Sequence, residues 1–535
     1  MPNTKPLQKA DFDAIIVGAG FAGLYMLHRL RKMGLSCRVI EAGGDVGGTW
    51  YWNRYPGARC DIQSMEYSYQ FDEELQQEWE WTERYATQPE ILSYINHVAE
   101  RFDLRKNISF ETRVTSANYE EDENKWIIKT DKSEQIRSQF FIMATGCLSV
   151  PNEPNFEGLE NFNGNHYLTA KWPHEGVEFT GLKVGVVGTG SSGIQCVPEI
   201  AKQADHLYVF QRRPTYSVPA HNQPLDPEKA KAIKANYAQF RQENSQKTFG
   251  TRIPPPEPSA IKADPEQRQE VYENAWERGG LGFAAAFADL MQDKDSNLSA
   301  AEFIRDKIHG IVEDTEVARL LSPDYTVFCR RLCVDTDYFA TFNRENVELV
   351  SISDSPIEKI TPKGLVTGGK EYELDAIVFA LGFDAMTGAL LRVDIRGRGG
   401  KSLKEKWKDG PKTYLGLAVE GFPNMFTITG PGSPSVLSNM IPAIEQHVNW
   451  ITDAIGHLKD NNLTTMEASS GAESSWMRLV ALLANATLFR SCGSYYNGAN
   501  IPRKPNVFMP FLGYPEYVKR CDDVVKNGYK GFELS

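Results

Sequence analysis

Residues 14–23 read AIIVGAGFAG, a short apolar run that breaks directly into three closely spaced glycines. The residues that follow, LYMLHRLRKMG, carry the periodicity of an amphipathic helix. A second β-rich run, residues 37–40, ends at Glu41, 23 residues beyond Gly18. A strand, a glycine turn, a helix and a distant acid are typical of a dinucleotide-binding fold, in which the glycines let the backbone meet a pyrophosphate and the acid accepts the ribose hydroxyls. The residues predicted to build this first site are Gly18, Gly20, Phe21, Gly23 and Glu41.

The same pattern returns at residues 184–193, VGVVGTGSSG, and the next strand-like run covers residues 207–210. The position 23 residues beyond Gly188 holds Gln211 instead of an acid, and two arginines follow it. An acid there would repel a 2′-phosphate, whereas guanidinium groups bind phosphate and stay charged. We therefore predict a second site that prefers NADPH to NADH. The residues assigned to it are Gly188, Thr189, Gly190, Ser191, Ser192, Gly193, Arg212 and Arg213.

The first site is predicted to hold FAD. Residues 45–50, DVGGTW, place a glycine turn shortly after Glu41, where the backbone can approach a flat ring system. Residues 421–432 are an apolar strand that breaks into another glycine turn, suitable for the flavin end of the cofactor. Gly48, Thr49 and Trp50 therefore join the predicted FAD-binding set. Two further runs, 141–146 and 377–384, are predicted strands at the crossing between the two dinucleotide-binding domains.

The chain is long enough for several domains, because its 535 residues exceed the roughly 250 to 300 at which a single core usually stops growing. The charged segments DPEKAKAIKANYAQFRQEN and DPEQRQEVYENAWERGG have helical periodicity. The predicted fold class is α/β, with two Rossmann-like dinucleotide-binding domains and a helical insertion in the NADPH domain. The predicted boundaries are 1–149 and 381–535 for the FAD domain, 150–217 and 326–380 for the NADPH domain, and 218–325 for the insertion.

The composition restricts the partners. A net charge of −12 disfavours binding to nucleic acid or to anionic lipid, and no apolar stretch approaches the roughly 20 residues of a membrane span. We expect a cytoplasmic protein without a membrane or nucleic-acid partner, either a monomer or a weak homo-oligomer. The eight cysteines contain no C-x-x-C pair, so we predict free buried thiols and no metal site.

Several longer stretches resemble the flavin-dependent (type I) Baeyer-Villiger monooxygenases, in particular the phenylacetone monooxygenase-like members. They are GGTWYWNRYPGARCDI at 47–62, WTERYATQPEIL at 81–92, GTGSSGIQ at 188–195, TYLGLAVEGFPNMF at 413–426 and GPGSPSVLSNM at 430–440. The resemblance covers nearly the whole chain. It implies that the chain uses NADPH and O2 to oxidise ketones to esters or lactones through a C4a-peroxyflavin, with sulfoxidation as a side activity.

The resemblance also implies roles for individual residues. Arg331 matches the family's active-site arginine, which supplies a permanent positive charge for the developing anion in a site closed to water. Asp61 matches the acid that pairs with this arginine beside the cofactor, and a buried pair needs both members. Other residues implied to contact the nicotinamide nucleotide are Thr189, Gln195, Arg330 and Tyr495, the last in place of a family tryptophan. An apolar ketone pocket is implied at Ser435, Val436 and Leu437.

One family fingerprint, F-x-G-x-x-x-H-x-x-x-W-P/D, is only partly kept. Phe162, Gly164, Trp172 and Pro173 fit it. The histidine position holds Leu168, and a histidine stands two places earlier as His166. In the family this histidine lies in an interdomain linker and couples NADPH-domain movement to catalysis, so Leu168 puts that coupling in doubt and leaves open whether His166 replaces it.

Two other functions stay open at this point. An N- or S-oxidising flavin monooxygenase shares both glycine loops, and an uncoupled NADPH oxidase or non-oxygenating flavoprotein would bind both nucleotides. Coupled ester formation, sulfoxide alone and peroxide alone would distinguish the three. The absence of a C-x-x-C dithiol argues against disulfide reductase chemistry.

Overall fold

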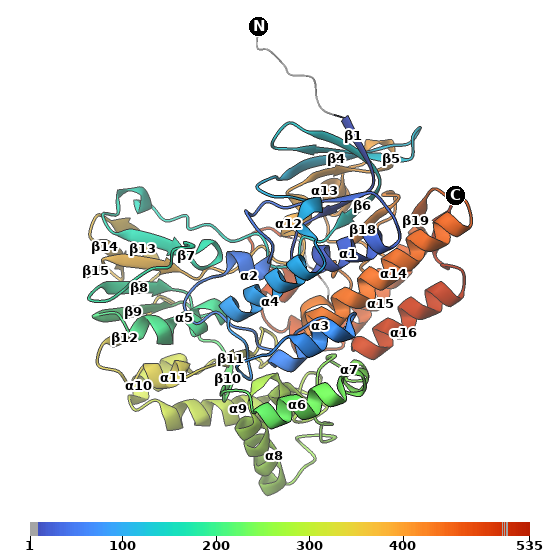
Figure 1. Cartoon of the computed structure of the whole chain (residues 1–535). Helices are drawn as coiled ribbons and strands as arrows, with labels where there is room; N and C mark the ends of the chain where they lie inside the picture. The colour runs from blue at the N-terminus through green and yellow to red at the C-terminus, as the bar shows by residue number, and fades with distance from the viewer. Residues whose placement is uncertain (1–8, 505–506, 508, 510–511) are drawn as a thin grey trace.

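The computed structural model describes residues 9–504, 507, 509 and 512–535, and two sheets form its frame (Figure 1). The first has the order β17-β4-β5-β6-β1-β2-β3, with β18 also pairing with β6. It is parallel except where the antiparallel strands β4, β5 and β6 meet. Its strands are β1 (Lys9–Val17), β2 (Cys37–Ile40), β3 (Ile108–Ser109), β4 (Val114–Glu120), β5 (Lys125–Thr130), β6 (Gln135–Met143), β17 (Asp394–Arg396) and β18 (Met425–Thr427).

The second sheet has the order β12-β9-β8-β16-β7, and all its strands are parallel. Its strands are β7 (Asn165–Leu168), β8 (Lys183–Val187), β9 (His206–Gln211), β12 (Val347–Ser351) and β16 (Ala376–Phe379). Smaller sheets are formed by β10 (Ser217–Pro219) with β11 (Cys333–Asp335), by β13 (Ile357–Thr361) with β14 (Gly364–Thr367) and β15 (Lys370–Glu373), and by β19 (Met466–Ala468) with β20 (Phe532–Leu534).

Each large sheet contains the strand–glycine loop–helix–strand unit expected from the sequence. In the first, β1 leads through the loop into α1 (Phe21–Lys32) and on to β2, which lies parallel to β1. In the second, β8 leads into α5 (Ser191–Ala201) and on to the parallel strand β9. The predicted crossing strands are present as β6 and β16, and the predicted late strand is β18. The expectation of two Rossmann-like units is therefore confirmed.

The segment predicted as a helical insertion contains α6 (Pro227–Ala235), α7 (Tyr237–Ser245), α8 (Pro265–Arg278), α9 (Lys294–Ile311) and α10 (Thr315–Leu321). Aspartates cap the N-termini of four of these helices, because each carboxylate accepts hydrogen bonds from backbone N–H groups of the first turn. The segment contacts both parts of the molecule. The Tyr237 hydroxyl donates to the Met65 carbonyl, and both residues belong to the core cluster that contains β1 and α1. Residues of α8 and α9 belong to the core cluster that contains β8 and α5, and Figure 1 shows the insertion helices below both sheets.

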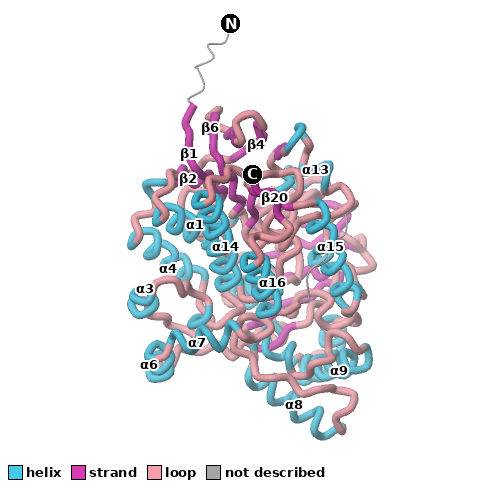
Figure 2. Tube along the Cα trace, turned by 90° about the vertical axis from the view of Figure 1, so that its right-hand side faces the viewer, coloured by secondary structure: helices cyan, strands magenta, loops and turns pink. Residues whose placement is uncertain are grey.

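The remaining helices are α2 (Thr49–Trp52), α3 (Glu73–Glu78), α4 (Gln88–Arg101), α11 (Tyr338–Thr341), α12 (Gly388–Leu391), α13 (Leu403–Lys406), α14 (Met440–Asp460), α15 (Ser470–Asn485) and α16 (Tyr514–Lys526). The long helix α14 lies between α1 and α16 and buries one face against each (Figure 2). Within the described part of the chain, no helix combines the length and the apolar character needed to cross a membrane.

The prediction that all cysteines are free is wrong for two of them. Cys329 and Cys492 form a disulfide with a Cα–Cα distance of 5.9 Å across a sequence separation of 163 residues. The other six cysteines are free and buried. A pair so far apart in sequence leaves no spacing pattern, because only the tertiary fold brings its two members together.

Candidate active site

The first glycine loop has the geometry that a pyrophosphate requires. A Cβ added to Gly18 would lie 2.6 Å from the Ala144 carbonyl oxygen, and one on Gly23 would lie 1.8 Å from the Gly18 carbonyl oxygen. Only glycine fits at these two positions. Gly20 is the N-cap of α1, and no side chain caps the N–H groups there. These N–H groups therefore remain free to meet an anion at the positive end of the helix.

Glu41 directly follows β2 and is a buried carboxylate beside this loop. Its Oε2 accepts from Ala19 N at 2.6 Å, and its Oε1 accepts from Gly43 N at 2.6 Å. Burial raises the pKa of Glu41 above its ordinary value, although these backbone hydrogen bonds oppose the rise. A fixed carboxylate with further lone pairs fits a ribose hydroxyl.

The predicted flavin turn lies against the same loop. Gly48 has φ +53°, and a Cβ there would lie 2.9 Å from the Gly20 Cα. Thr49 begins α2, and the buried Trp50 donates from Nε1 to the Tyr67 hydroxyl at 3.3 Å. The residues present therefore form a cradle that fits FAD.

The second glycine loop repeats the first. A Cβ on Gly188 would lie 2.5 Å from the Ala380 carbonyl oxygen, and one on Gly193 would lie 2.1 Å from the Gly188 carbonyl oxygen. Gly190 caps α5 without a side-chain hydrogen bond, and a Cβ there would enter open space. This free space above uncapped N–H groups fits the second pyrophosphate. Thr189 Oγ1 donates to the Arg213 carbonyl at 2.9 Å, which connects the loop to the residues after β9. Ser191 Oγ lies 3.2 Å from the Cys333 sulfur, which connects the start of α5 to β11.

Three arginines gather where β9 ends. Arg212 and Arg213 are exposed, and Arg330 is half-buried with its guanidinium 4.9 Å from the centre of the Tyr325 ring. Burial lowers the pKa of Arg330, and the positive charges of Arg213 and Arg212 lower it further. Among the described residues, the buried Arg330 Nε has no hydrogen-bond partner. A cluster of three guanidinium groups of this kind fits a dianionic phosphate.

The structure brings Arg331 and Asp61 together across 270 positions of sequence. Arg331 Nη2 and Nε donate to the same Asp61 oxygen, Oδ2, at 2.7 and 3.1 Å. The Arg331 side chain is 25% exposed and that of Asp61 is 11% exposed. Burial opposes the charge of Arg331, but Asp61, and after it Tyr495 and Tyr496, raise its pKa well above the ordinary value. The site therefore keeps a permanent cation.

An apolar cluster lies beside this cation. It contains Cys147, Ala385, Met386, Val507 and Met509, with Val436, Leu437, Met440 and Tyr495 packed against it. Ser435 is buried with φ +48°, and its Oγ finds no hydrogen-bond partner among the residues that the structure describes. The three predicted pocket residues, 435–437, thus lie in one short turn, and Tyr495 packs against the same cluster. Cys147 and Met386 of this cluster come after the crossing strands β6 and β16.

Comparison with known proteins assigns the family. The family model of the pyridine nucleotide-disulphide oxidoreductases matches residues 15–254. A Baeyer-Villiger monooxygenase from Pseudooceanicola batsensis is 42% identical, over 98% of this chain and 97% of that protein. The chain belongs to the Baeyer-Villiger monooxygenases. This monooxygenase also matches the structure of an oxidised steroid monooxygenase bound to NADP, with a TM-score of 0.95, 48% identity and coverage of 98% and 99% of the two chains. A complex of OTEMO with FAD and NADP matches with a TM-score of 0.94 and 38% identity, over 98% and 99% of the chains. Both of these structures hold NADP, and the OTEMO complex also holds FAD.

In this Baeyer-Villiger monooxygenase, part of the fingerprint segment that lacks the family's histidine, residues 162–173, forms a strand. Residues 165–168 form β7, an edge strand that pairs with β16. Because side chains two positions apart point to the same face of a strand, His166 and Leu168 share a face. Leu168 is buried among Val187 and Phe379, whereas His166 is exposed. Trp172, which fits the fingerprint, is buried.

The side chain of Gln195 is used within the protein. Its Oε1 accepts from the Tyr55 hydroxyl at 2.8 Å, and its Nε2 donates to the Arg59 carbonyl at 3.1 Å. A Cβ on Gly57 would lie 2.2 Å from the Gln195 carbonyl oxygen, so α5 sits directly on the loop that carries Asp61. Gln195 therefore ties the second glycine-loop unit to the loop of the arginine site.

Sequence reasoning missed Tyr496, Cys147 and Met386. Tyr496 is buried, its ring lies 4.6 Å from that of Tyr495, and it faces the Arg331 charge. Its signal was its position next to Tyr495. Cys147 and Met386 come just after the two predicted crossing segments, 141–146 and 377–384. In folds of this type ligands bind beyond the carboxyl ends of such strands.

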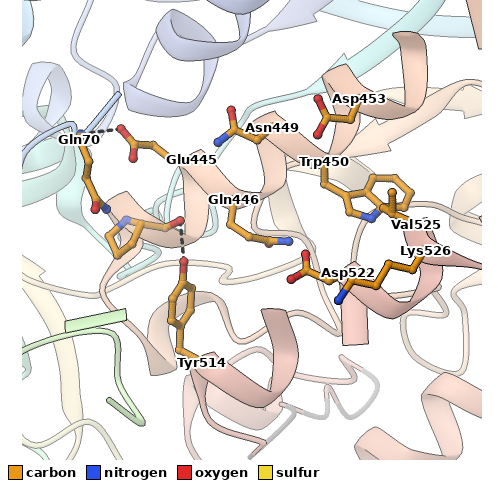
Figure 3. Close-up of a pocket in the computed structure, with 11 residues that line it drawn as sticks. Gln70, Glu445, Gln446, Asn449, Trp450, Asp453, Tyr514, Asp522, Val525 and Lys526 are labelled. Carbon is orange, nitrogen blue, oxygen red and sulfur yellow. Dashed lines mark hydrogen bonds between the residues drawn. The ribbon is translucent and has the colours of Figure 1, made fainter. Parts of the chain in front are cut away.

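A separate polar pocket of about 440 Å³ lies between α14 and α16 (Figure 3). It shares none of its lining residues with the cluster around Arg331. Its buried carboxylate is that of Glu445, whose Oε1 accepts from Gln70 N at 2.7 Å. Burial raises the pKa of Glu445 to about 7.

Proposed function

We propose that this monooxygenase converts apolar ketones to esters or lactones, consuming NADPH, O2 and a proton and releasing NADP⁺ and water. The observation that carries the proposal is the Arg331–Asp61 pair beside the apolar cluster, between two glycine loops. When bound, FAD that has been reduced by NADPH activates O2 for transfer of one oxygen atom to the ketone.

The protein's own part in the reaction is largely electrostatic. Oxygen addition to a carbonyl places negative charge on the carbonyl oxygen, and a fixed guanidinium in a poorly hydrated site stabilises that charge without reorganising. Asp61 holds the Arg331 guanidinium in one orientation through two donor contacts. Cys147, Met386, Val436 and Leu437 offer an apolar surface to the substrate.

The nucleotides are assigned to the two loops by chemistry. Gly18, Gly20 and Gly23 bind the pyrophosphate of FAD, and Glu41 accepts its ribose hydroxyls. Gly188, Gly190 and Gly193 bind the pyrophosphate of NADPH. The 2′-phosphate is held by Arg212, Arg213 and Arg330. We retain the boundaries near 149, 217, 325 and 380 for the two domains and the insertion, and cytoplasmic monomers or weak homo-oligomers as the working form.

The test is a panel of linear, aryl and cyclic ketones, with a thioether and an amine beside them. Product, NADPH consumed and hydrogen peroxide released are measured in each reaction. We expect ketone-stimulated NADPH consumption that ends in ester or lactone. Sulfoxide or N-oxide alone would instead support an N- or S-oxidising enzyme, and peroxide alone an uncoupled oxidase.

A further inference from the structure

The disulfide joins two segments that build the arginine site. Cys329 directly precedes Arg330 and Arg331, and Cys492 lies three residues before Tyr495. The cross-link therefore connects the segment that carries the permanent cation to the loop whose tyrosines face it. Six other cysteines are free, so the pairing is specific to this position.

The loop transmits the position of Cys492 to the tyrosines because it is internally rigid. Asn497 Nδ2 donates to the Cys492 carbonyl at 3.0 Å, and its Oδ1 accepts from Ser494 N at 3.0 Å. Ser494 and Asn497 form a capping box around the turn that contains Tyr495 and Tyr496. Fixing Cys492 therefore fixes the two phenols.

A second contact holds the far end of the loop. The Lys504 ammonium donates to an Asp384 carboxylate oxygen, and Asn500 Nδ2 donates to the Phe383 carbonyl at 2.7 Å. Both partners lie just beyond β16, at the crossing between the sheets. Reduction does not break the ion pair or the hydrogen bond at this far end, but it does break the disulfide. A redox change can therefore release only the end of the loop that Cys492 holds.

We propose that Cys329 and Cys492 are a thiol–disulfide redox site that sets how tightly the loop of Tyr495 and Tyr496 closes on Arg331. With the disulfide formed, the loop covers the cation and NADPH oxidation is coupled to oxygen transfer. With both thiols reduced, the loop opens at its Cys492 end and more of the reducing power is lost as hydrogen peroxide. The coupling part of this proposal rests on the proposed function.

The geometry favours attack on one sulfur. Cys329 is buried, whereas Cys492 is partly exposed, so a thiolate of a dithiol reductant reaches Cys492 Sγ first. The sulfur–sulfur bond breaks, its electron pair leaves with Cys329 Sγ, and that sulfur takes a proton. The second thiol of the reductant then displaces Cys492, which leaves a protein dithiol and one oxidised, cyclic reductant.

The neighbouring free thiol does not compete in this exchange. Burial raises the pKa of Cys333, two residues after Arg331, to about 12. Since the thiolate is the attacking species, this cysteine stays inert near neutral pH. The redox state therefore belongs to the Cys329–Cys492 pair. In a compartment kept reducing by thiols, disulfides are rare, and those that form are usually transient and either catalytic or redox-sensing.

The first experiment needs no variant and no turnover. Air-purified holoenzyme is treated with or without dithiothreitol under native conditions, alkylated, and analysed by peptide mass mapping and by limited trypsin digestion. We expect Cys329 and Cys492 to become alkylated only after reduction, and cleavage after the exposed Arg490, two residues before Cys492, to accelerate by about twofold or more as the loop opens at that end. Free thiols at both positions in the air-purified enzyme, or equal cleavage rates in the two redox states, would overturn the proposal.

The second experiment measures peroxide released per NADPH during ketone oxidation. The ratio is expected to rise by about twofold or more when the wild-type enzyme is reduced. A Cys329→Ser/Cys492→Ser variant should show the raised ratio already and ignore dithiothreitol. A reductant effect that persists in the double variant would refute the assignment to this pair. An enzyme that forms no ester in either state would refute the proposed function instead, and the mass and cleavage results would still decide the redox site.

Discussion

Replacing Asp61 with alanine should disable oxygen transfer more than it damages the fold. The substitution removes the only carboxylate oxygen that accepts from the Arg331 guanidinium among the described residues, at 2.7 and 3.1 Å. Arg331 would stay charged, because a guanidinium keeps its proton at working pH, but it would lose the carboxylate that orients it. The Asp61→Asn variant keeps the shape and one acceptor oxygen, so it should lie between the wild type and alanine.

The size of the effect follows from the burial of the pair. Removing one member of a fully buried ion pair costs about 3–5 kcal/mol. Arg331 is 25% exposed, so water solvates part of the uncompensated charge and about 1–3 kcal/mol remains. If the transition state bears this whole cost, ester formation slows by about 5- to 150-fold.

The assay follows ester, NADPH and peroxide together, with urea unfolding as the measure of stability. We expect the turnover rate for ester to fall, peroxide per NADPH to rise, and the unfolding free energy to drop by no more than about 3 kcal/mol. Glu273→Gln is the matched control, because it breaks another partly buried pair, with Lys307 at 2.6 Å, between α8 and α9 of the insertion. Wild-type ester formation by Asp61→Ala, or an equal loss in the control, would refute the reasoning.

Three further predictions concern other parts of the molecule. Arg330→Leu should raise the KM for NADPH by about 10-fold or more and change the KM for NADH by less than about twofold, because a hydrogen bond to a charged group contributes about 1.5–3 kcal/mol. Equal changes in the two KM values would contradict this prediction. Burial raises the pKa of Glu445 from 4.5 to about 7, so the native state retains a proton that the unfolded chain has released, and stability should fall as pH rises from 4.5 through 7. Glu445→Gln should flatten that fall and stabilise the enzyme at pH 8 by up to about 3 kcal/mol in urea unfolding; an unchanged pH slope would exclude this role. Leu168→His should lower the free energy of unfolding by about 1–3 kcal/mol, because it buries an imidazole among apolar side chains. His166→Ala should change the same free energy by less than about 0.5 kcal/mol. A larger loss for His166→Ala than for Leu168→His would contradict the placement of β7.

The two glycine-loop units were predictable because their signals are local. Strand, turn, helix and strand follow one another within about 30 residues, and the glycines are needed for contacts inside each unit, such as Gly23 against Gly18. The arginine preference for NADPH could also be read locally, since Arg212 and Arg213 directly follow the end of β9. Arg330 joins them only in space.

The arginine site was reached through a family resemblance, because its contacts are long-range. Arg331 and Asp61 are 270 positions apart, and the Cys329–Cys492 disulfide spans 163. No periodicity or spacing encodes such pairs. The short strand β7 was also missed, since its four residues, NHYL, are too few to show an alternating pattern.

The most direct test of the central claim, that the guanidinium of Arg331 makes oxygen transfer to a ketone productive, is ester formation under ¹⁸O2 by the wild-type enzyme and by Arg331→Ala. The wild type should place one labelled oxygen in each ester molecule. The variant should still oxidise NADPH but lose labelled ester by about 100-fold or more, the scale seen when a stabilising donor is removed from a developing oxyanion, with peroxide in its place. Labelled ester at the wild-type rate from Arg331→Ala would contradict the account.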